Sequence, residues 1–595
     1  MLSKSLGLLL ALSLSMALSA CLGSGSSSPQ SKTGPTVTGI ALAPQNSAVT
    51  AGKTLQFSAK ATYSDGSNQD ITSSATWQTS DSGVATVKAG NVSGIKPGVI
   101  QVRVSSGTGA GAVSATAVLN VTSKNFNKAS LKGSYTFSLT TALTSPNLQF
   151  ETGSLNADGN GNITGVEDMN GPSGAAKDVS LSGSYSITAD GRGILTLNTS
   201  GQSARTLRFV LSANSATPGD NNGALIEFDG AHNALGTLEK QDSSAFANTA
   251  LANHNYVFRT GGLDASGHPM AAIGIFTTDS SGTTVSAGKE DINDNGTINN
   301  GAGAANAVAI TGGTISTLDG SSGRASLSLT TSVGTSNYEI YVVSANKIEV
   351  VGVDTNPAVG HAEMQVQPAP PSISAGGYLL QTDIGGIAGQ FWQTGQVGVD
   401  NTAHFTAGVI TQDGGVNEVF VNPAGSITMG ADGRATFQQA TSAGSLNCTF
   451  YMISSNKMYL LQTNEAHAGT GLLELQAPGP DGFTSPTLNN TFAASGAELG
   501  DGNVAFVQQF VSDGMGHVVG IADVSQPQSG NPAQLVTSTV VINATYPAPN
   551  SIGGVTFNVS SPGLGVSALS VLLQSPNSAA IVGVPNDVDG WMVTQ

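Results

Sequence analysis

The chain contains few of the residues on which most catalytic and nucleic-acid-binding sites depend. Of its 595 residues, only 10% are charged and 5% are aromatic, and two are cysteines. Lys and Arg together number 21 against 38 Asp and Glu, which gives a net charge of −17. Because phosphate backbones are bound by clustered Lys and Arg, this balance argues against a nucleic-acid partner. We expect the acidity to keep an exported protein soluble.

Catalytic motifs are also missing from the sequence. It has no Gly-x-Ser-x-Gly elbow, no His-Glu-x-x-His zinc helix and no phosphate-binding loop between a strand and a helix. Cys448 lies in a predicted strand, where a small buried residue is the expected role. The seven histidines are scattered, and most lie near predicted turns: His232, His254, His268, His361, His404, His467 and His517. We therefore expect no enzyme.

The N-terminal segment, residues 1–20, has the form of an export signal. One Lys precedes an apolar run from Leu6 to Leu18 that is too short to be a permanent membrane span. The run ends in Leu18-Ser19-Ala20-Cys21, which resembles the lipobox of bacterial lipoproteins. That resemblance implies cleavage before Cys21 and a lipid on its thiol, so the membrane is an expected partner.

A flexible tether is predicted for residues 21–35, which are rich in Ser and Gly and show no apolar periodicity. Leu22 follows the lipidated Cys, and the absence of Asp there is consistent with outer-membrane sorting in bacteria that use an Asp retention rule. We expect a lipoprotein of the cell envelope, in the outer membrane and exposed at the surface. No later segment is long and apolar enough to span a membrane as a helix.

The first predicted domain covers residues 36–122. Short runs such as Leu55–Ala59 and Val84–Val87 alternate with turns such as Asp65-Gly66, which is typical of antiparallel strands. Trp77 is the expected centre of a two-sheet core. The order of these motifs resembles the bacterial Ig-like domain, group 2. The resemblance implies a spacer or adhesive module without a catalytic site.

The rest of the chain contains four copies of a repeat of about 110 residues, a period typical of tandem domains. The copies span residues 129–242, 250–367, 373–477 and 486–595. Each opens with an aromatic-bearing strand, continues through hairpins marked by Asp-Gly or a similar pair, and closes with a short strand that ends in Gln.

Each copy is predicted to hold about eight antiparallel strands in meander order. Such a meander can close into a barrel of the lipocalin or avidin kind, which removes the exposed sheet edges. A sandwich of similar size is the alternative. We therefore expect an all-β protein: an Ig-like sandwich followed by four tandem β-domains, with barrels favoured. The repeats resemble tandem β-repeats of bacterial envelope proteins, a resemblance that transfers no activity.

A candidate calcium site lies at Asp291, Asn293 and Asn295. Oxygen ligands at alternate positions and Gly296 at the sixth position fit the first half of a calcium loop. Position twelve is Ala302, where a bidentate Glu is needed. The alternative is a hairpin whose Asp and Asn bond their own backbone.

Two other features of the sequence are candidates for catalysis or binding. The neighbours Glu290 and Asp291 point to opposite faces of a strand, so they do not form a glycosidase pair. Trp392 and Trp591 could stack on sugars, although a chain poor in aromatics needs most of them in its cores.

Three functions remain open from the sequence. The leading hypothesis is a non-enzymatic surface lipoprotein that acts in adhesion, matrix attachment or carbohydrate contact, with an extracellular polysaccharide or protein as partner. The alternative is that each barrel binds a small apolar ligand in lipocalin fashion, and a third possibility is an architectural stalk. Solid barrel cores would exclude an internal ligand, whereas a lined cavity of several hundred Å3 would support one.

Overall fold

The computed structural model describes most of the chain after the N-terminal segment. The described residues are 34–107, 112–144, 147–212, 221–366, 372–383, 393–412, 416–419, 427, 429–442, 444–463, 469–478, 481–498, 504–528, 531–551, 553–559, 568–584 and 589–594. In this part of the chain, no helix is long and apolar enough to cross a membrane.

The first unit contains three small β-sheets with the strand orders β1-β4-β5, β2-β10-β9-β6 and β3-β8-β7. The strands are β1 (Val37–Ala43), β2 (Asn46–Thr50), β3 (Thr54–Gln56), β4 (Ser58–Tyr63), β5 (Asn68–Asp70), β6 (Thr76–Thr79), β7 (Ala85–Lys88), β8 (Asn91–Gly94), β9 (Gly98–Ser106) and β10 (Val113–Thr122). Phe57 is fully buried in the core. Trp77 lies at the edge of that core, because its indole N–H donates to the backbone oxygen of Thr72 (2.8 Å). The expectation that Trp77 fills the centre is therefore corrected.

The first repeat forms a closed eight-stranded antiparallel barrel. Its strands are β11 (Lys132–Thr144), β12 (Asn147–Asp158), β13 (Asn162–Asn170), β14 (Ala176–Ile187), β15 (Arg192–Thr199), β16 (Arg205–Ser212), β17 (Asn222–Glu227) and β18 (Asn233–Lys240). The fourth repeat closes in the same way. Its strands are β36 (Thr491–Glu498), β37 (Val504–Ser512), β38 (His517–Gln528), β39 (Asn531–Thr545), β40 (Gly554–Val559), β41 (Ala568–Ser575), β42 (Ser578–Val584) and β43 (Asp589–Thr594).

The second repeat is a nine-stranded sheet that closes through an additional pairing of β20 with β21. Its strands are β19 (Asn255–Leu263), β20 (Pro269–Thr278), β21 (Thr284–Asp294), β22 (Thr297–Ile298), β23 (Val308–Ile315), β24 (Arg324–Thr331), β25 (Thr335–Ser344), β26 (Lys347–Gly352) and β27 (Ala358–Met364). The favoured barrel is therefore confirmed over the sandwich for these repeats.

The third repeat has the same meander, with β31 and β32 at the two ends of its described eight-stranded sheet. Its strands are β28 (Gly376–Asp383), β29 (Gln393–Val399), β30 (Phe405–Gln412), β31 (Val416–Val419), β32 (Arg434–Ala440), β33 (Ser445–Ser454), β34 (Lys457–Gln462) and β35 (Thr470–Leu475). The two ends meet just beyond β32, where the Ser442 amide donates to the Val419 oxygen (2.9 Å). We call the four repeats the first to fourth barrels.

The hairpin turns explain why the meander forms so regularly. In the turn between β12 and β13, the Asp158 carboxylate accepts hydrogen bonds from the amides of Asn160, Gly161 and Asn162 (2.7–3.0 Å). Gly159 and Gly161 take φ values of 78° and 115° there, a region that side chains disfavour. The short polar turn thus fixes the strand register that places alternate residues inside the barrel.

Each barrel core is closed at one end by the segment that leads into it. Short 3-10 helices lie there: η2 (Lys128–Ser130), η3 (Ser243–Ala245), η4 (Asn248–Leu251) and η7 (Ser485–Leu488). Leu131, Leu251 and Leu488 next to or within these turns are at most 1% exposed and join the barrel cores. The lead-in segments therefore act as apolar plugs.

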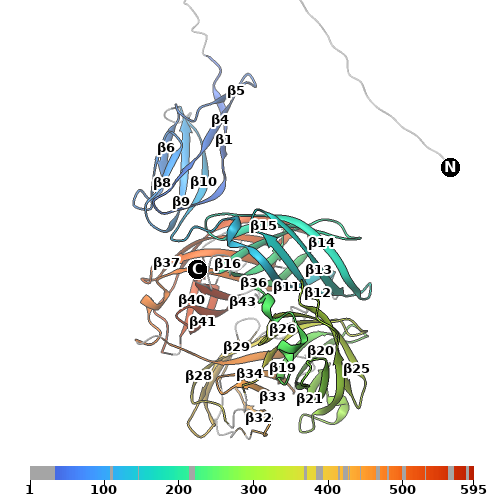
Figure 1. The fold of residues 1–595 in the computed structure, drawn as a ribbon. Helices are drawn as coiled ribbons and strands as arrows, with labels where there is room; N and C mark the ends of the chain where they lie inside the picture. The colour runs from blue at the N-terminus through green and yellow to red at the C-terminus, as the bar shows by residue number, and fades with distance from the viewer. Residues whose placement is uncertain are drawn as a thin grey trace, which may run out of the picture.

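The four barrels form a closed ring, as Figure 1 shows. The second strand of each barrel packs against strands six to eight of the next one: β12 on β25–β27, β20 on β33–β35 and β29 on β41 and β42. The same surface of the fourth barrel, on β37, packs against β16–β18 of the first. Head-to-tail contacts of this kind produce a ring when the rotation closes. We call the contacts seams and name each by the two barrels that it joins.

Candidate functional site

The predicted calcium residue Asp291 lies on β21 in the second–third seam and is fully buried. Its two carboxylate oxygens accept hydrogen bonds from Nε and Nη2 of Arg434 on β32 (both 2.7 Å). Tyr451 on β33 donates its hydroxyl to the same carboxylate (2.8 Å), and so does the Asn299 amide (2.8 Å). Asp291 therefore links two barrels through a bidentate ion pair, the strongest geometry for a carboxylate and a guanidinium.

The neighbouring predicted ligands also have other partners. Asn293 donates Nδ2 to the backbone oxygen of Gln462 (3.0 Å), and its Oδ1 accepts from the Gly296 amide (2.8 Å). Asn295 occupies a turn position with a φ of 45°. Among the described residues, no group of three or more His, Cys, Asp or Glu side chains could hold a metal ion.

Because Arg434 already neutralises Asp291, these residues do not fit a calcium ion in the arrangement observed. Calcium binding here stays a prediction, and Asp291 has a structural role that the sequence did not suggest.

The same arrangement recurs in the first–second seam: an Asp of one barrel is bound by an Arg and a Tyr of the next. We call this arrangement the Asp–Arg clamp. Asp168 on β13 accepts from Nε and Nη2 of Arg324 on β24 (2.7 and 2.8 Å), and the Tyr341 hydroxyl on β25 donates to it (2.5 Å). Burial and the Asp168 carboxylate raise the pKa of Tyr341 well above its usual value, so the phenol stays a donor. Asp168, Arg324 and Tyr341 occupy the same barrel positions as Asp291, Arg434 and Tyr451.

A weaker version of the clamp closes the ring. Arg192 on β15 of the first barrel lies 3.5 Å from the carboxylate of Asp523 on β38 of the fourth barrel. Arg192 also pairs with Asp190 (2.9 Å). Burial alone would raise the pKa of Asp190, but the ion pair with Arg192 lowers it overall. Three seams thus contain an Asp of one barrel paired with an Arg of the next.

A second repeated link joins a Glu of one barrel to a Lys of the next. Lys347 at the start of β26 contacts Glu239 of the first barrel (2.5 Å), and Lys457 at the start of β34 contacts Glu363 of the second (2.7 Å). Both ion pairs are partly shielded from solvent, with side chains 19–27% exposed. They add opposite charges across each seam and fix which strands face each other.

A buried histidine lies beside these charges. The ring of His361 on β27 accepts a hydrogen bond from Nε of Arg259 (3.3 Å). Burial, followed by the charges of Arg259, Lys347 and Lys457, lowers the pKa of His361 well below its usual value. His361 is therefore neutral and structural, in line with the role expected for the histidines.

The closing Gln of the first three repeats makes the third repeated link. The side-chain amide of Gln241 donates to the backbone oxygens of Ser322 and Val342 (2.9 and 2.7 Å). Gln365 donates to Asp432 and Met452 (2.9 and 2.8 Å), and Gln476 to Leu573 (2.5 Å). The conserved position of this Gln at the end of each copy is thus explained by its bond to the following barrel. Gln595 lies outside the described residues.

Apolar clusters fill three of the seams. Leu148 and Phe150 meet Val351 in the first–second seam, and Ile273 and Ile275 meet Tyr459 in the second–third seam. In the fourth–first seam, the members are Val210, Ile226, Ala493, Ala505 and Val507. These residues point outward from their strands, opposite to the barrel cores. Each of these three seams therefore combines apolar burial with ion pairs.

The Ig-like unit is docked where the first and fourth barrels meet. Asn120 on β10 is fully buried and donates to Oδ2 of Asp190 (3.1 Å) and to the side chain of Gln509 on β37. The hydroxyl of Thr122 donates to the Ala189 oxygen (3.3 Å). One Asn thus contacts both barrels that close the ring.

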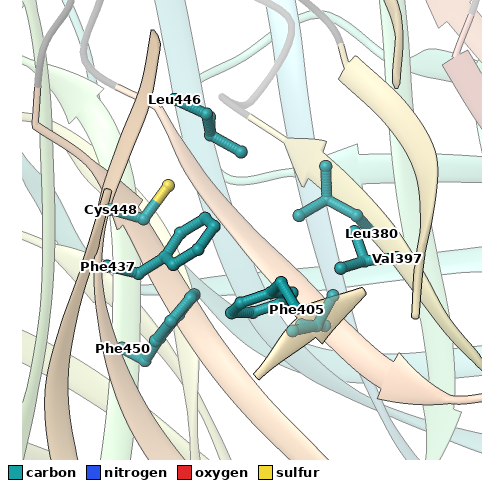
Figure 2. A pocket seen from close by; sticks show the side chains of 8 residues that line it. Leu380, Val397, Phe405, Phe437, Leu446, Cys448 and Phe450 are labelled. Carbon is teal, nitrogen blue, oxygen red and sulfur yellow. The ribbon is translucent and has the colours of Figure 1, made fainter. Parts of the chain in front are cut away.

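The barrel interiors are packed with side chains. Cys448 is buried in the third barrel among Phe437 and Phe450, and burial raises the pKa of its thiol, as expected for an inert core cysteine. A small apolar cavity lies beside it (Figure 2), lined by Leu380, Val397, Phe405, Phe437, Leu446, Cys448, Phe450 and Leu473. This cavity has room for about one water molecule, far less than the several hundred Å3 of a ligand pocket.

The inner wall of the first barrel becomes polar at the end opposite the plug. Nη1 of Arg205 donates to both carboxylate oxygens of Glu151 (2.8 Å each), and Nη2 lies 3.5 Å from Glu167. Burial and the charge of Glu151 raise the pKa of Glu167 to about 7. In the second barrel, Glu290 lies at the corresponding position, and burial raises its pKa to about 7 as well. Glu290 faces inward while Asp291 faces the seam, so this pair diverges as the strand pattern predicts.

Some predicted residues cannot be placed. Cys21 and Trp392 lie outside the described residues, and so does the side chain of Trp591. Three of the histidines occupy hairpin turns beside an Asp four residues earlier: Asp264–His268, Asp400–His404 and Asp513–His517. Because these Asp–His pairs are exposed and lie within single turns, we assign them a role in stabilising the turns.

The seam clamps were missed by sequence reasoning, although a signal for them existed. Arg192, Arg324 and Arg434 occur at one aligned position of three copies. Asp168, Asp291 and Asp523 occur at another. The third copy lacks this Asp, and the fourth copy lacks this Arg. That offset of one copy indicates that the Asp of each repeat pairs with the Arg of the next.

Comparison with known proteins identifies the first unit. Residues 36–117 match the family model of the bacterial Ig-like domain, group 2. The first unit is a bacterial Ig-like domain. Ice-binding protein 1 from Shewanella frigidimarina (strain NCIMB 400) is 42% identical over 91 residues, which is 14% of this chain and 10% of that protein. The chain thus matches about a tenth of the length of this relative.

Among solved structures, intact Ap-TbpB with its N and C lobes is 9% identical, with a TM-score of 0.14 over 63% of this chain and 84% of that one. Transferrin binding protein B from serogroup B Neisseria meningitidis is 10% identical, with a TM-score of 0.14 over 62% of this chain and 83% of that one. We infer nothing from similarities this low.

Proposed function

We propose that this chain is a non-enzymatic surface lipoprotein that acts in adhesion, matrix attachment or carbohydrate contact. The observation that carries the proposal is the ring: four packed barrels, with buried ion pairs and apolar clusters in three of the four seams and the Ig-like domain docked on two barrels. A lipid on Cys21 and the tether of residues 21–35 would hold this ring at the outer membrane. The bacterial Ig-like domain agrees with an extracellular or envelope location.

The outer face of the first barrel suggests how contact is made. Along β14, Ser180, Ser182, Ser184 and Ser186 are all exposed. Exposed Thr164 and Asn198 stand beside Ser182 on the flanking strands. Hydroxyl and amide groups exchange hydrogen bonds readily with a neutral hydroxyl-rich polymer. We propose that this face contacts an extracellular polysaccharide.

The other two hypotheses have less support. Packed cores disfavour a lipocalin-like ligand inside the described barrels, and the cavity described in the third barrel has room for about one water molecule. A purely architectural stalk would not need an uncharged polar face, but it predicts the same ring, so experiment must separate the two.

Binding of the Cys21→Ser form to an array of glycans and matrix polymers tests the proposal. We expect binding to at least one neutral polysaccharide, and at least a tenfold loss in the Ser182→Glu/Ser184→Glu variant. Thr116→Glu on the exposed face of the Ig-like domain is the matched control and should bind normally. No binding to any polymer would favour the stalk. The same Cys21→Ser change should release the protein from membranes, and continued membrane association would refute the lipid anchor.

A further inference from the structure

The third–fourth seam differs from the seam before it at equivalent positions of the strand ladder. In the second–third seam, Asp291 is paired in register with Ile273. The equivalent register pair in the third barrel is Thr411 with Thr394. On the facing side, the pair Arg434 and Tyr451 of the third barrel is matched in the fourth by Gly554 and Leu572. Both halves of the Asp–Arg clamp are thus replaced together.

The Glu–Lys link is replaced as well. Glu474 on β35 is the counterpart of Glu363, since each pairs in register with the Lys that begins the preceding strand. In the fourth barrel, the position of Lys457 is taken by Ser578, which follows the same Ser-x-Asn turn. The fourth barrel therefore has a serine at the position from which Lys457 of the third barrel pairs with Glu363.

One apolar pair of the second–third seam is also replaced by polar residues. Ile273 and Ile275 of β20 correspond to Thr394 and Gln396 of β29, which are only 1% and 6% exposed. The hydroxyl of Thr394 and the side-chain nitrogen of Gln396 are buried without a hydrogen-bond partner. The equivalent Thr152 hydroxyl of the first–second seam is also unpartnered, but there the Asp168–Arg324 ion pair offsets its cost. Buried polar groups that lack partners destabilise the closed contact relative to one in which water reaches them.

Amide hydrogen bonds remain across this seam. The Ala477 amide donates to the Gln574 oxygen (2.8 Å), and the Gln574 side chain donates to the Leu475 oxygen (2.8 Å). Within the described ranges, neither an ion pair nor an apolar cluster joins the third barrel to the fourth.

We propose that the ring opens at the third–fourth seam while the other three seams stay closed. The fourth barrel then moves with the first barrel and the Ig-like domain, to which Asp523 and Asn120 hold it. The third barrel moves with the second, to which Asp291, Ile273 and Glu363 hold it.

Three equivalent amides report on the opening. The Asp242 amide donates to Val343 across the first–second seam (2.7 Å), and the Val366 amide to Ile453 across the second–third seam (2.9 Å). The Ala477 amide holds the same position in the third–fourth seam. In hydrogen exchange of the intact Cys21→Ser protein, corrected for intrinsic rates, we expect Ala477 to exchange at least tenfold faster than Asp242 and Val366. Amides within β41 should stay protected, because the barrel itself does not unfold.

Matched substitutions separate the seam from the general stability of its barrels. Thr394→Ile with Gln396→Ile restores the apolar pair and should slow exchange at Ala477 about tenfold. The reverse change, Ile273→Thr with Ile275→Gln, should speed exchange at Val366 by a similar factor.

Two outcomes would overturn the proposal. In one, Ala477 is as protected as Asp242 and Val366. In the other, Ala477 and β41 exchange at the same rate, which would mean that the fourth barrel unfolds as a whole.

Discussion

At the scale of single residues, the molecule depends on charges that are buried between domains. Asp168 and Asp291 have no exposed surface, and each meets an Arg of the next barrel. A buried carboxylate is tolerated only when a cation and hydrogen-bond donors compensate for its lost hydration. This requirement explains why the Asp and the Arg are replaced together in the third–fourth seam.

Removing one partner of such a pair should be costly. We expect Asp291→Asn to lower the free energy of unfolding by about 3–5 kcal/mol, because Arg434 is left buried without its counter-charge. Urea unfolding measures the effect. The double variant Asp291→Asn/Arg434→Met is the control and should recover most of the loss. Equal losses in the single and double variants would show that the ion pair is not what Asp291 contributes.

Buried Glu290 should make stability depend on pH. Burial, aided by the neighbouring Asp291, raises its pKa from 4.5 to about 7. The folded state then binds more protons than the unfolded state between these values, so stability falls as pH rises from about 4.5 to 7. We expect Glu290→Gln to be about 3 kcal/mol more stable than the natural protein at pH 8 and similar to it below pH 4.5.

A control with the opposite sign is available for this experiment. The pKa of Asp319 is lowered to about 2 by hydrogen bonds from Ser321 and Ser322. Asp319→Asn should therefore lose stability at neutral pH and match the natural protein only as pH falls toward 2. Urea titrations at several pH values measure both variants, and a pH-independent effect of Glu290→Gln would contradict the assignment.

At the scale of strands, the outward-facing residues of a seam strand pack against the next barrel, whereas the inward-facing residues line the interior of their own barrel. On β12, Phe150 is fully buried in the first–second seam, whereas Glu151 beside it points into the barrel. We expect Phe150→Ala to lower the free energy of unfolding by about 3–5 kcal/mol through the cavity that it leaves. Exchange at the Asp242 amide should rise with it, and Phe150→Leu should have a smaller effect on both. Unchanged exchange at Asp242 would mean that Phe150 does not hold the seam.

The sequence predicts the strands and their alternation, but it does not predict which outward-facing residues are buried. The turns Asp158–Gly161 and Asp513–Gly516 marked the strands, and the eight-strand period indicated barrels, because both are local signals. The pattern could not show that Phe150 and Ile273 face another barrel. Residues buried between domains look like exposed apolar residues until the neighbour is known. For the same reason, the sequence did not show that Asp291 pairs with Arg434.

At the scale of the whole molecule, the Ig-like domain is part of the ring and not a free spacer. Asn120 contacts Asp190 of the first barrel and Gln509 of the fourth. We expect Asn120→Ala to uncouple the Ig-like domain, with a larger radius of gyration in small-angle X-ray scattering. Thr116→Ala on the exposed side of the same strand should leave that radius unchanged. An unaltered radius in Asn120→Ala would show that other contacts suffice for docking.

The fourth–first seam also constrains the order in which the molecule folds. Asn120 docks the Ig-like domain at this seam and is 389 residues from its partner Gln509, whereas the other seams join neighbouring repeats. Contacts between distant segments form late, since the loop between them must close first. As the chain folds from its N-terminus, each barrel can fold and dock onto the one before it, but the Ig-like domain must wait for the last barrel. Until then, the apolar face of Val210 and Ile226 is uncovered, which makes the period before ring closure the one in which this protein is most exposed to aggregation and proteolysis.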